Sequence, residues 1–111
     1  MCAILFLVFC TSAWAQVLPG VDVFCEEGHF SSLKGKRVGL LTNHTGVNTQ
    51  MRSTLQLFQE NAHVTAIFSP EHGLKGAHYA AEKIQHGNEQ GISVYSLHGE
   101  TRRPTSIWSR R

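Results

Sequence analysis

Three apolar segments separated by polar, turn-rich loops organise the chain beyond its first thirty residues. Arg37–Thr42 is nearly continuously apolar and lies between glycine and asparagine. This pattern is typical of a strand buried on both faces of a parallel sheet. Val64–Phe68 is β-branched and apolar and predicts a second strand. Ile92–Leu97, which follows the turn residues Gly87–Asn88, predicts a third.

A helix is predicted between the first two strands. Met51, Leu55 and Phe58 recur at i, i+4 and i+7, which places them on one helix face. Either Asn48 or Thr49 can cap the start of this helix. A strand, a helix and a second strand in this order form a βαβ unit, whose crossover is almost always right-handed. The predicted fold class is therefore α/β, with a Rossmann-like open parallel sheet.

The first fifteen residues predict a signal peptide. Ala3–Cys10 is an apolar core that is too short to span a bilayer, and Thr11–Ala15 supplies an A-x-A cleavage site before Gln16. No basic residue precedes the apolar core, and a buried N-terminal strand or helix is the alternative. We expect a signal peptide in residues 1–15, a Rossmann-like domain in residues 16–111, and export to the periplasm or the cell exterior.

Composition narrows the classes of function. Cys25 is the only cysteine after the expected leader, so no internal disulfide is predicted, and its spacing from Val21 and Phe24 is helical. The net charge is +2 and the basic residues are scattered, which disfavours a nucleic-acid partner. The seven histidines show no H-E-x-x-H spacing, so no metal is expected. Neither a G-x-G-x-x-G nor a P-loop motif follows the first strand, so no nucleotide cofactor is expected.

The three loops that follow the predicted strands carry most of the polar chemistry. They are Asn43–Gly46, Ser69–Gly73 and His98–Arg103. In an open parallel sheet such loops emerge at one edge, where ligands bind, although polar loops are ordinary in any α/β domain. The connection Pro70–Gly91 is long, with one weak helical stretch at Ala77–Ile84, and connections of that length are often functional.

Glu71 is the candidate catalytic residue at this edge. Pro70 constrains the backbone before it and Gly73 permits a sharp exit, so its carboxylate sits on a corner that the long loop can shelter, as suits a general acid. The alternative is a solvated loop glutamate. His72 can orient a substrate or pack on the rim, and Arg102 can clamp a carboxylate or remain solvated.

The chain also resembles a known family through an ordered series of motifs: Gly20–Asp22, Leu33–Val47, Pro70–Gly73, Val94–Leu97 and Gly99–Thr105. Together these motifs resemble the NamZ-type exo-β-N-acetylmuramidases. The resemblance implies a Rossmann-like N-terminal domain joined to a second α/β domain. It also implies hydrolysis that releases N-acetylmuramic acid from the non-reducing ends of peptidoglycan fragments.

The resemblance assigns expected roles to individual residues. The P-E-H-G glutamate is Glu71, which makes it the leading catalytic candidate. Glycosidases usually use two carboxylates, and Glu100 on the neighbouring loop is a weaker second candidate. Glu82 corresponds to a Gly-Glu of the family pattern, with alanine here in place of the glycine. The expected substrate-binding residues are Asn43, His72, Glu82, Glu100 and Arg102, with a muropeptide as partner and no cofactor.

Two departures from the family pattern lower the activity that we expect of this chain. Ser106–Arg111 does not resemble the family's continuation, and Gln85–Gly91 is shortened and altered. Family members run to several hundred residues, so the sequence predicts a truncated domain with little or no hydrolase activity. A non-catalytic glycan-binding module and an inactive gene product are the alternatives.

Overall fold

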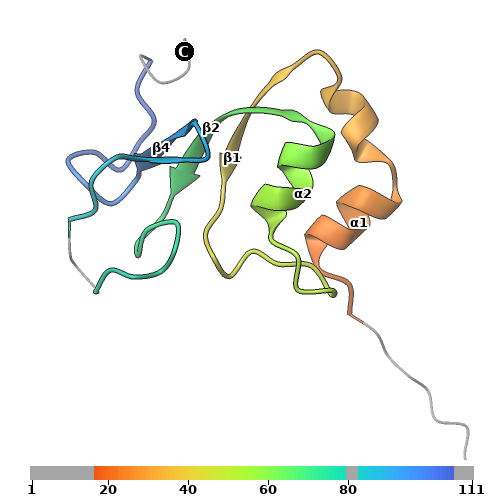
Figure 1. Ribbon diagram of the computed structural model, residues 1–111, viewed down its shortest axis with the longest axis horizontal. Helices are drawn as coiled ribbons and strands as arrows, with labels where there is room; N and C mark the ends of the chain where they lie inside the picture. Colours follow the sequence, from red (N-terminus) through yellow and green to blue (C-terminus); the bar gives the residue numbers. More distant parts are fainter. Residues whose placement is uncertain (1–16, 80–82, 107–111) are drawn as a thin grey trace, which may run out of the picture.

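The computed structural model describes residues 17–79 and 83–106 and has an α/β fold, as predicted (Figure 1). The predicted signal peptide and Glu82 lie outside the described residues. In chain order the elements are α1 (Gly20–Glu26), the 3-10 helix η1 (His29–Leu33), β1 (Arg37–Leu41), α2 (Thr54–Asn61), β2 (His63–Ser69), β3 (Gly87–Glu89) and β4 (Ile92–Ser96). None of the helices in the described ranges has the length and hydropathy needed to cross a membrane.

The described strands form one mixed sheet in the order β1-β2-β4-β3. The three predicted strands, β1, β2 and β4, pair in parallel, whereas β3 pairs antiparallel with β4. The predicted parallel strands are thus formed, and β3 adds an antiparallel strand at the edge that the sequence analysis did not predict. Gly87–Glu89 is short and polar and has no strand-like pattern, and it joins β4 through Gln90 and Gly91, both with positive φ, in a tight hairpin turn.

Strand β1 lies at the open edge of the sheet, not between two covered layers. The expectation that it is buried on both faces is wrong, because Leu41 is 61% exposed while Leu40 is buried. Gly39 lies against β2, where a Cβ would come within 2.9 Å of the Phe68 ring. The apolar residues of β1 thus have different surroundings: Leu40 is buried, Gly39 lies close to the Phe68 ring, and Leu41 is exposed.

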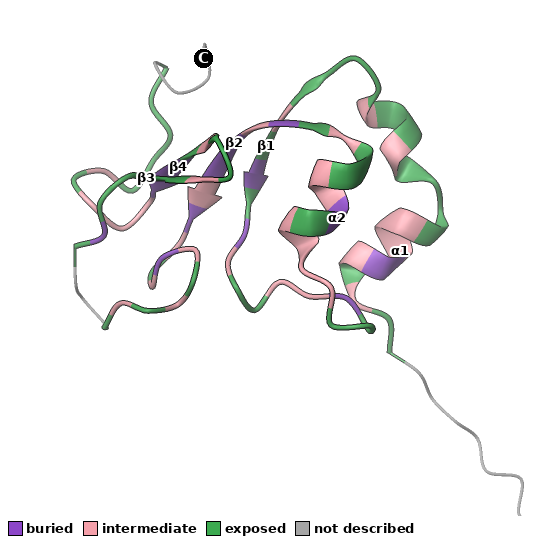
Figure 2. Cartoon of the chain, in the orientation of Figure 1, coloured by how far each residue is buried: buried purple, intermediate pink, exposed green. Residues whose placement is uncertain are grey.

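The core lies between the sheet and α2. Leu40, Val64, Ile67 and Val94 form its centre, and partly buried side chains pack around them: Leu55, Phe58, Leu74 and Ile92. Figure 2 shows buried positions mainly on the strands, and the buried residue of α2 is Leu57. Leu55 and Phe58, which the sequence predicts on one helix face, are partly buried against this core, whereas Met51 lies before the helix begins.

An aromatic cluster attaches α1 and η1 to α2. The Phe24 ring centroid lies 5.1 Å from that of Phe30 and 5.3 Å from that of Phe58, while Phe30 and Phe58 are 4.9 Å apart. The buried Asp22 carboxylate of α1 also accepts a hydrogen bond of 2.8 Å from the Thr49 backbone N–H. The helical pattern predicted around Cys25 is confirmed by α1.

Helix α2 begins later than the sequence predicts. Its N-cap is Ser53, whose Oγ accepts a hydrogen bond of 3.1 Å from the Gln56 N–H, and neither Asn48 nor Thr49 caps it. The Asn48 side-chain oxygen instead accepts from the backbone of residues 50 and 52, at 3.0 and 2.8 Å. This local turn competes with helix formation and leaves Met51 exposed at φ 60°.

The weak helix predicted at Ala77–Ile84 is not formed by its described parts, residues 77–79 and 83–84. Instead, the backbone here packs against the end of β4. The Ile84 N–H donates to the His98 carbonyl at 3.1 Å. The described residues between β2 and β3 thus form loops held by their contacts with neighbouring segments.

Candidate functional site

The carboxyl ends of the parallel strands place the predicted loops at one edge of the sheet. Backbone hydrogen bonds continue the ladder past the strands themselves: Thr42 N–H donates to Phe68 O at 3.1 Å, and Leu97 N–H donates to Ser69 O at 2.9 Å. The loops that follow β2 and β4 therefore start side by side. This is the edge at which open α/β sheets bind ligands.

Glu71 meets His98 at this edge. The His98 Nε2 atom lies 3.5 Å from Glu71 Oε1, and the two side chains are 15% and 50% exposed. The shelter that we expected around the Glu71 carboxylate is therefore only partial. His98 was not among the individual site residues predicted from the sequence, although its loop was.

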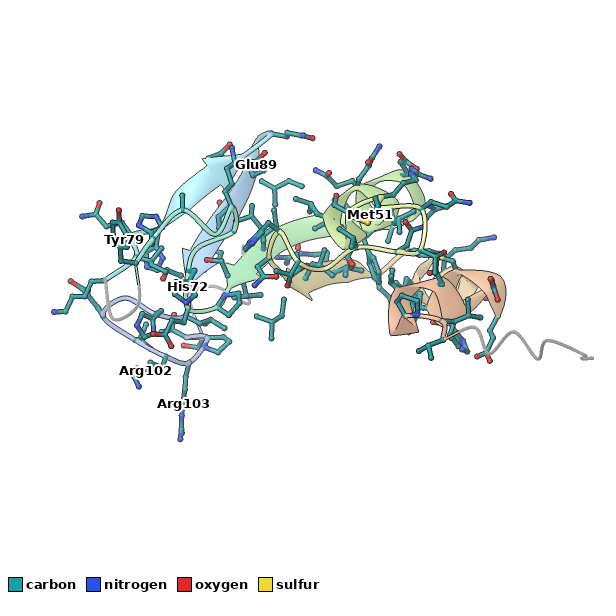
Figure 3. All side chains as sticks on the ribbon, turned by 90° about the horizontal axis from the view of Figure 1, so that it is seen from below. Met51, His72, Tyr79, Glu89, Arg102 and Arg103 are labelled. Atoms are coloured by element: carbon teal, nitrogen blue, oxygen red, sulfur yellow. The ribbon has the colours of Figure 1, made fainter. Side chains whose placement is uncertain are left out.

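The ring of His72 is fixed by the loop that carries Glu71. Its Nδ1 atom lies 2.7 Å from the backbone oxygen of His78. A carbonyl oxygen can only accept, so Nδ1 must carry the proton, and in the neutral ring Nε2 is then the acceptor. The His78 N–H returns a hydrogen bond of 3.2 Å to the His72 carbonyl, so the two residues close a compact loop beside Glu71. Figure 3 shows His72 among the loops beyond the end of β2.

A close glycine contact joins this loop to the loop after β1. A Cβ on Gly76 would lie 2.1 Å from Cε1 of the His44 ring, and Gly76 also has φ +69°. Only glycine fits both the space and this left-handed backbone conformation. His44 therefore packs directly on the backbone of the loop that presents Glu71.

Asn43 shapes the loop after β1. Its Oδ1 atom accepts hydrogen bonds from the Thr45 backbone N–H at 3.1 Å and from Thr45 Oγ1 at 2.7 Å. Asn43 also lines a shallow, largely apolar surface depression, together with Phe24, Leu41 and Pro70. This depression extends from α1 to Pro70, the residue before Glu71.

The remaining predicted residues lie apart from this arrangement or outside the described part of the chain. Glu100 and Arg102 are exposed on the loop after β4. That loop is closed by Thr101, whose Oγ1 donates to Arg103 O and accepts from Arg103 N–H at 2.9 and 3.1 Å. Arg102 and Arg103 point away from the body of the molecule in Figure 3. Glu82 lies outside the described residues, among which no group of three or more His, Cys, Asp or Glu side chains could hold a metal ion.

Comparison with known proteins identifies the family of this chain. Residues 38–108 match the family model described as "Exo-beta-N-acetylmuramidase NamZ, N-terminal", and the chain belongs to this family. The chain is 38% identical over 99 residues to the peptidoglycan beta-N-acetylmuramidase NamZ of Bacillus subtilis (strain 168), an alignment that covers 86% of the chain and 24% of the relative.

A crystal structure of a DUF1343-family protein from Bacteroides fragilis has the same fold. It superposes with a TM-score of 0.65 at 41% identity and covers 80% of the chain and 22% of that protein. The chain therefore spans about a quarter of the length of these two relatives, with coverages of 24% and 22%. The resemblance predicted from the ordered motifs is confirmed.

Proposed function

We propose that this chain carries the acid/base glutamate of an exo-β-N-acetylmuramidase, Glu71, and takes part in releasing N-acetylmuramic acid from the non-reducing ends of peptidoglycan fragments. The supporting observation is the position of Glu71. It stands on the Pro-Glu-His-Gly corner, directly beyond the carboxyl end of β2, in a chain that belongs to the NamZ family. General acid/base chemistry requires a carboxylate held at a ligand-binding edge, within reach of the glycosidic oxygen.

Further residues have binding roles in this proposal. His72 offers an imidazole of defined tautomer beside Glu71, suited to hydrogen-bonding a sugar hydroxyl. Asn43, Glu82, Glu100 and Arg102 remain candidate substrate-binding positions. Glu100 remains the candidate for the second carboxylate that glycosidases usually need.

Turnover of a chromogenic β-N-acetylmuramide by the purified chain tests the proposal. We expect at most slow release of the chromophore, in keeping with the low activity predicted from the sequence, because the half-exposed Glu71 carboxylate remains open to water. Glu71→Gln should abolish this release, whereas Glu60→Gln, which changes an exposed glutamate on α2, should not alter it. Equal turnover in wild type and Glu71→Gln contradicts the assigned role.

A glycan-binding module without catalysis is the second candidate, and the exposure of Glu71 favours it. Isothermal titration with N-acetylmuramic acid separates the two. Binding that survives Glu71→Gln, in a chain without measurable turnover, supports the module. The absence of both binding and turnover contradicts both candidates.

Export is also part of the proposal, based on the apolar core Ala3–Cys10 and the cleavage site that follows it. Mass spectrometry of the protein recovered outside the cytoplasm should give a chain beginning at Gln16. Recovery of only the full-length chain from the cytoplasm contradicts export.

A further inference from the structure

The register of the sheet brings Glu71 and His98 together. Ser69 of β2 and Ser96 of β4 are partners in the parallel ladder, and the Leu97 N–H carries that ladder one bond further by donating to Ser69 O at 2.9 Å. Glu71 stands two positions after Ser69, and His98 stands two positions after Ser96. Both residues therefore lie just beyond neighbouring strand ends, where their side chains approach each other.

His98 is the better-fixed member of this pair. Its backbone N–H donates to Ser96 Oγ at 3.1 Å, and its carbonyl accepts from the Ile84 N–H at 3.1 Å. A Cβ on the following residue, Gly99, would lie 2.7 Å from the Ile84 carbonyl oxygen, so the chain passes closely against residue 84 here. With its main chain held on both sides and its side chain 15% exposed, the imidazole has little freedom to move. The Glu71 side chain is 50% exposed.

The geometry suits an imidazole that orients a carboxylate. The separation of 3.5 Å between His98 Nε2 and Glu71 Oε1 exceeds the usual N–H···O range. Catalytic hydrogen bonds are often long in the absence of ligand and shorten when substrate binds. A donor on Oε1 fixes the plane of the carboxylate, and with it the direction in which the other oxygen meets a substrate.

We propose that His98 is a positioning residue that orients the Glu71 carboxylate for proton transfer. The proposal rests on the proposed function, in which Glu71 is the acid/base group. His98 acts through Glu71 and needs no contact with the sugar. The competing explanation is that His98 only packs the loop after β4 against residue 84.

The contact can be tested without any enzymatic activity. Long-range ¹H–¹⁵N correlation spectra of the labelled 111-residue chain resolve the imidazole nitrogens. We expect Glu71→Gln to shift the Nε2 and ring-proton resonances of His98, because the charged partner is removed. Glu60→Gln is the matched control, since it neutralises a glutamate of α2 that pairs with Arg52, and it should leave His98 unchanged. Unshifted His98 resonances in Glu71→Gln overturn the proposal.

The positioning role has a separate kinetic test on the chromogenic β-N-acetylmuramide. His98→Leu should lower kcat by about 10- to 100-fold, because a misdirected proton donor loses that much rate. KM should stay within about twofold, because the residue does not bind the sugar. His98→Gln, which keeps an N–H donor, should recover most of the lost rate.

The outcomes separate the two proposals. If Glu71→Gln abolishes turnover but His98→Leu and His98→Gln both behave like wild type, the positioning role is wrong and the proposed function stands. If both variants lose rate equally while their melting temperatures fall together, His98 is structural and the positioning role is again wrong. If the wild-type chain shows no turnover, both the proposed function and the positioning role are wrong. The spectra still decide whether the contact between His98 and Glu71 exists.

Discussion

The chain has two regions that are held together by different forces. Residues 20–69 contain α1, η1, β1, α2 and β2, and apolar packing joins these elements through the core and the aromatic cluster. The described part of residues 70–106 contains β3, β4 and several loops. Val94 of β4 belongs to the core, whereas the loops are held mainly by hydrogen bonds and by close contacts at glycine. The proposed catalytic glutamate stands at the boundary. Catalytic residues are often carried this way, on loops that a rigid scaffold positions.

Because the two regions are held differently, we expect mutations in them to have different effects on stability and on the site. Loss of apolar volume in the first region removes stability from the whole domain. Disturbing the loops of the second region should misplace the site while leaving most of the fold intact, because the centre of the core lies on β1, β2 and β4 and not on these loops.

The largest expected effect is in the first region. Ile67 on β2 is fully buried at the centre of the core. Ile67→Ala should lower the free energy of unfolding by about 3 kcal/mol, through lost burial and the cavity left behind. Leu41→Ala, at an exposed position of the neighbouring strand, is the control and should cost less than about 1 kcal/mol. Urea denaturation followed by circular dichroism measures both, and equal losses would contradict the placement of the core.

A smaller effect is expected from Gly76 in the second region. Gly76→Ala should cost about 2 kcal/mol, because the methyl group collides with the His44 ring and the residue must also keep φ +69°. Gly28→Ala is the matched control, since Gly28 has φ +72° but no atom within 4 Å of a Cβ, and it should cost only about 1 kcal/mol. The His44 imidazole resonances should shift in Gly76→Ala alone. A cost equal to that of Gly28→Ala would mean that the contact between the two loops is not formed.

The start of α2 gives a third, still smaller prediction. Ser53→Ala should cost about 1 kcal/mol by removing the hydrogen bond to the Gln56 N–H. Thr49→Ala, at a position that the sequence offered as the cap, should cost less than about 0.5 kcal/mol. Thermal melts of the two variants compare the caps directly. A larger loss for Thr49 would place the helix start where the sequence predicted it.

The smallest expected effect is the pH dependence of an exposed ion pair. The Arg52 guanidinium, which donates to Glu60 Oε1 at 2.7 Å, lowers the pKa of Glu60, and this outweighs the opposing effect of desolvation. Because the folded-state pKa is the lower one, the pair stabilises the fold above the usual glutamate pKa, and this contribution is lost as pH falls through the lowered value. The Tm difference between wild type and Glu60→Gln should therefore be positive at neutral pH and vanish in acid. It should also shrink in high salt, and a difference independent of pH would contradict the pairing.

The sequence by itself determined the α/β class, the three parallel strands, the βαβ order and the edge at which the polar loops emerge. Apolar runs and helical spacing are local patterns, and they predict these elements because the same apolar residues form the core. The family followed from short motifs in a fixed order.

Only the tertiary structure decided the remaining features. Strand β3 exists because β4 offers it a partner, and no pattern within its own residues indicates a strand. The Asn48 side chain accepts a hydrogen bond from the Arg52 N–H, so residues 48–52 form a turn and α2 begins only after Ser53. The spacing of apolar residues does not reveal such a side-chain hydrogen bond.

The site shows the same division. Glu71 could be predicted because its motif is contiguous in the sequence. His98 could not, because it meets Glu71 through the register between β2 and β4, which pairs Ser69 with Ser96. Its equal spacing from the strand end was the only available signal, and that signal has meaning only once the register is known. A contiguous motif can be identified from the sequence, whereas contacts between loops depend on the pairing of the strands that carry those loops.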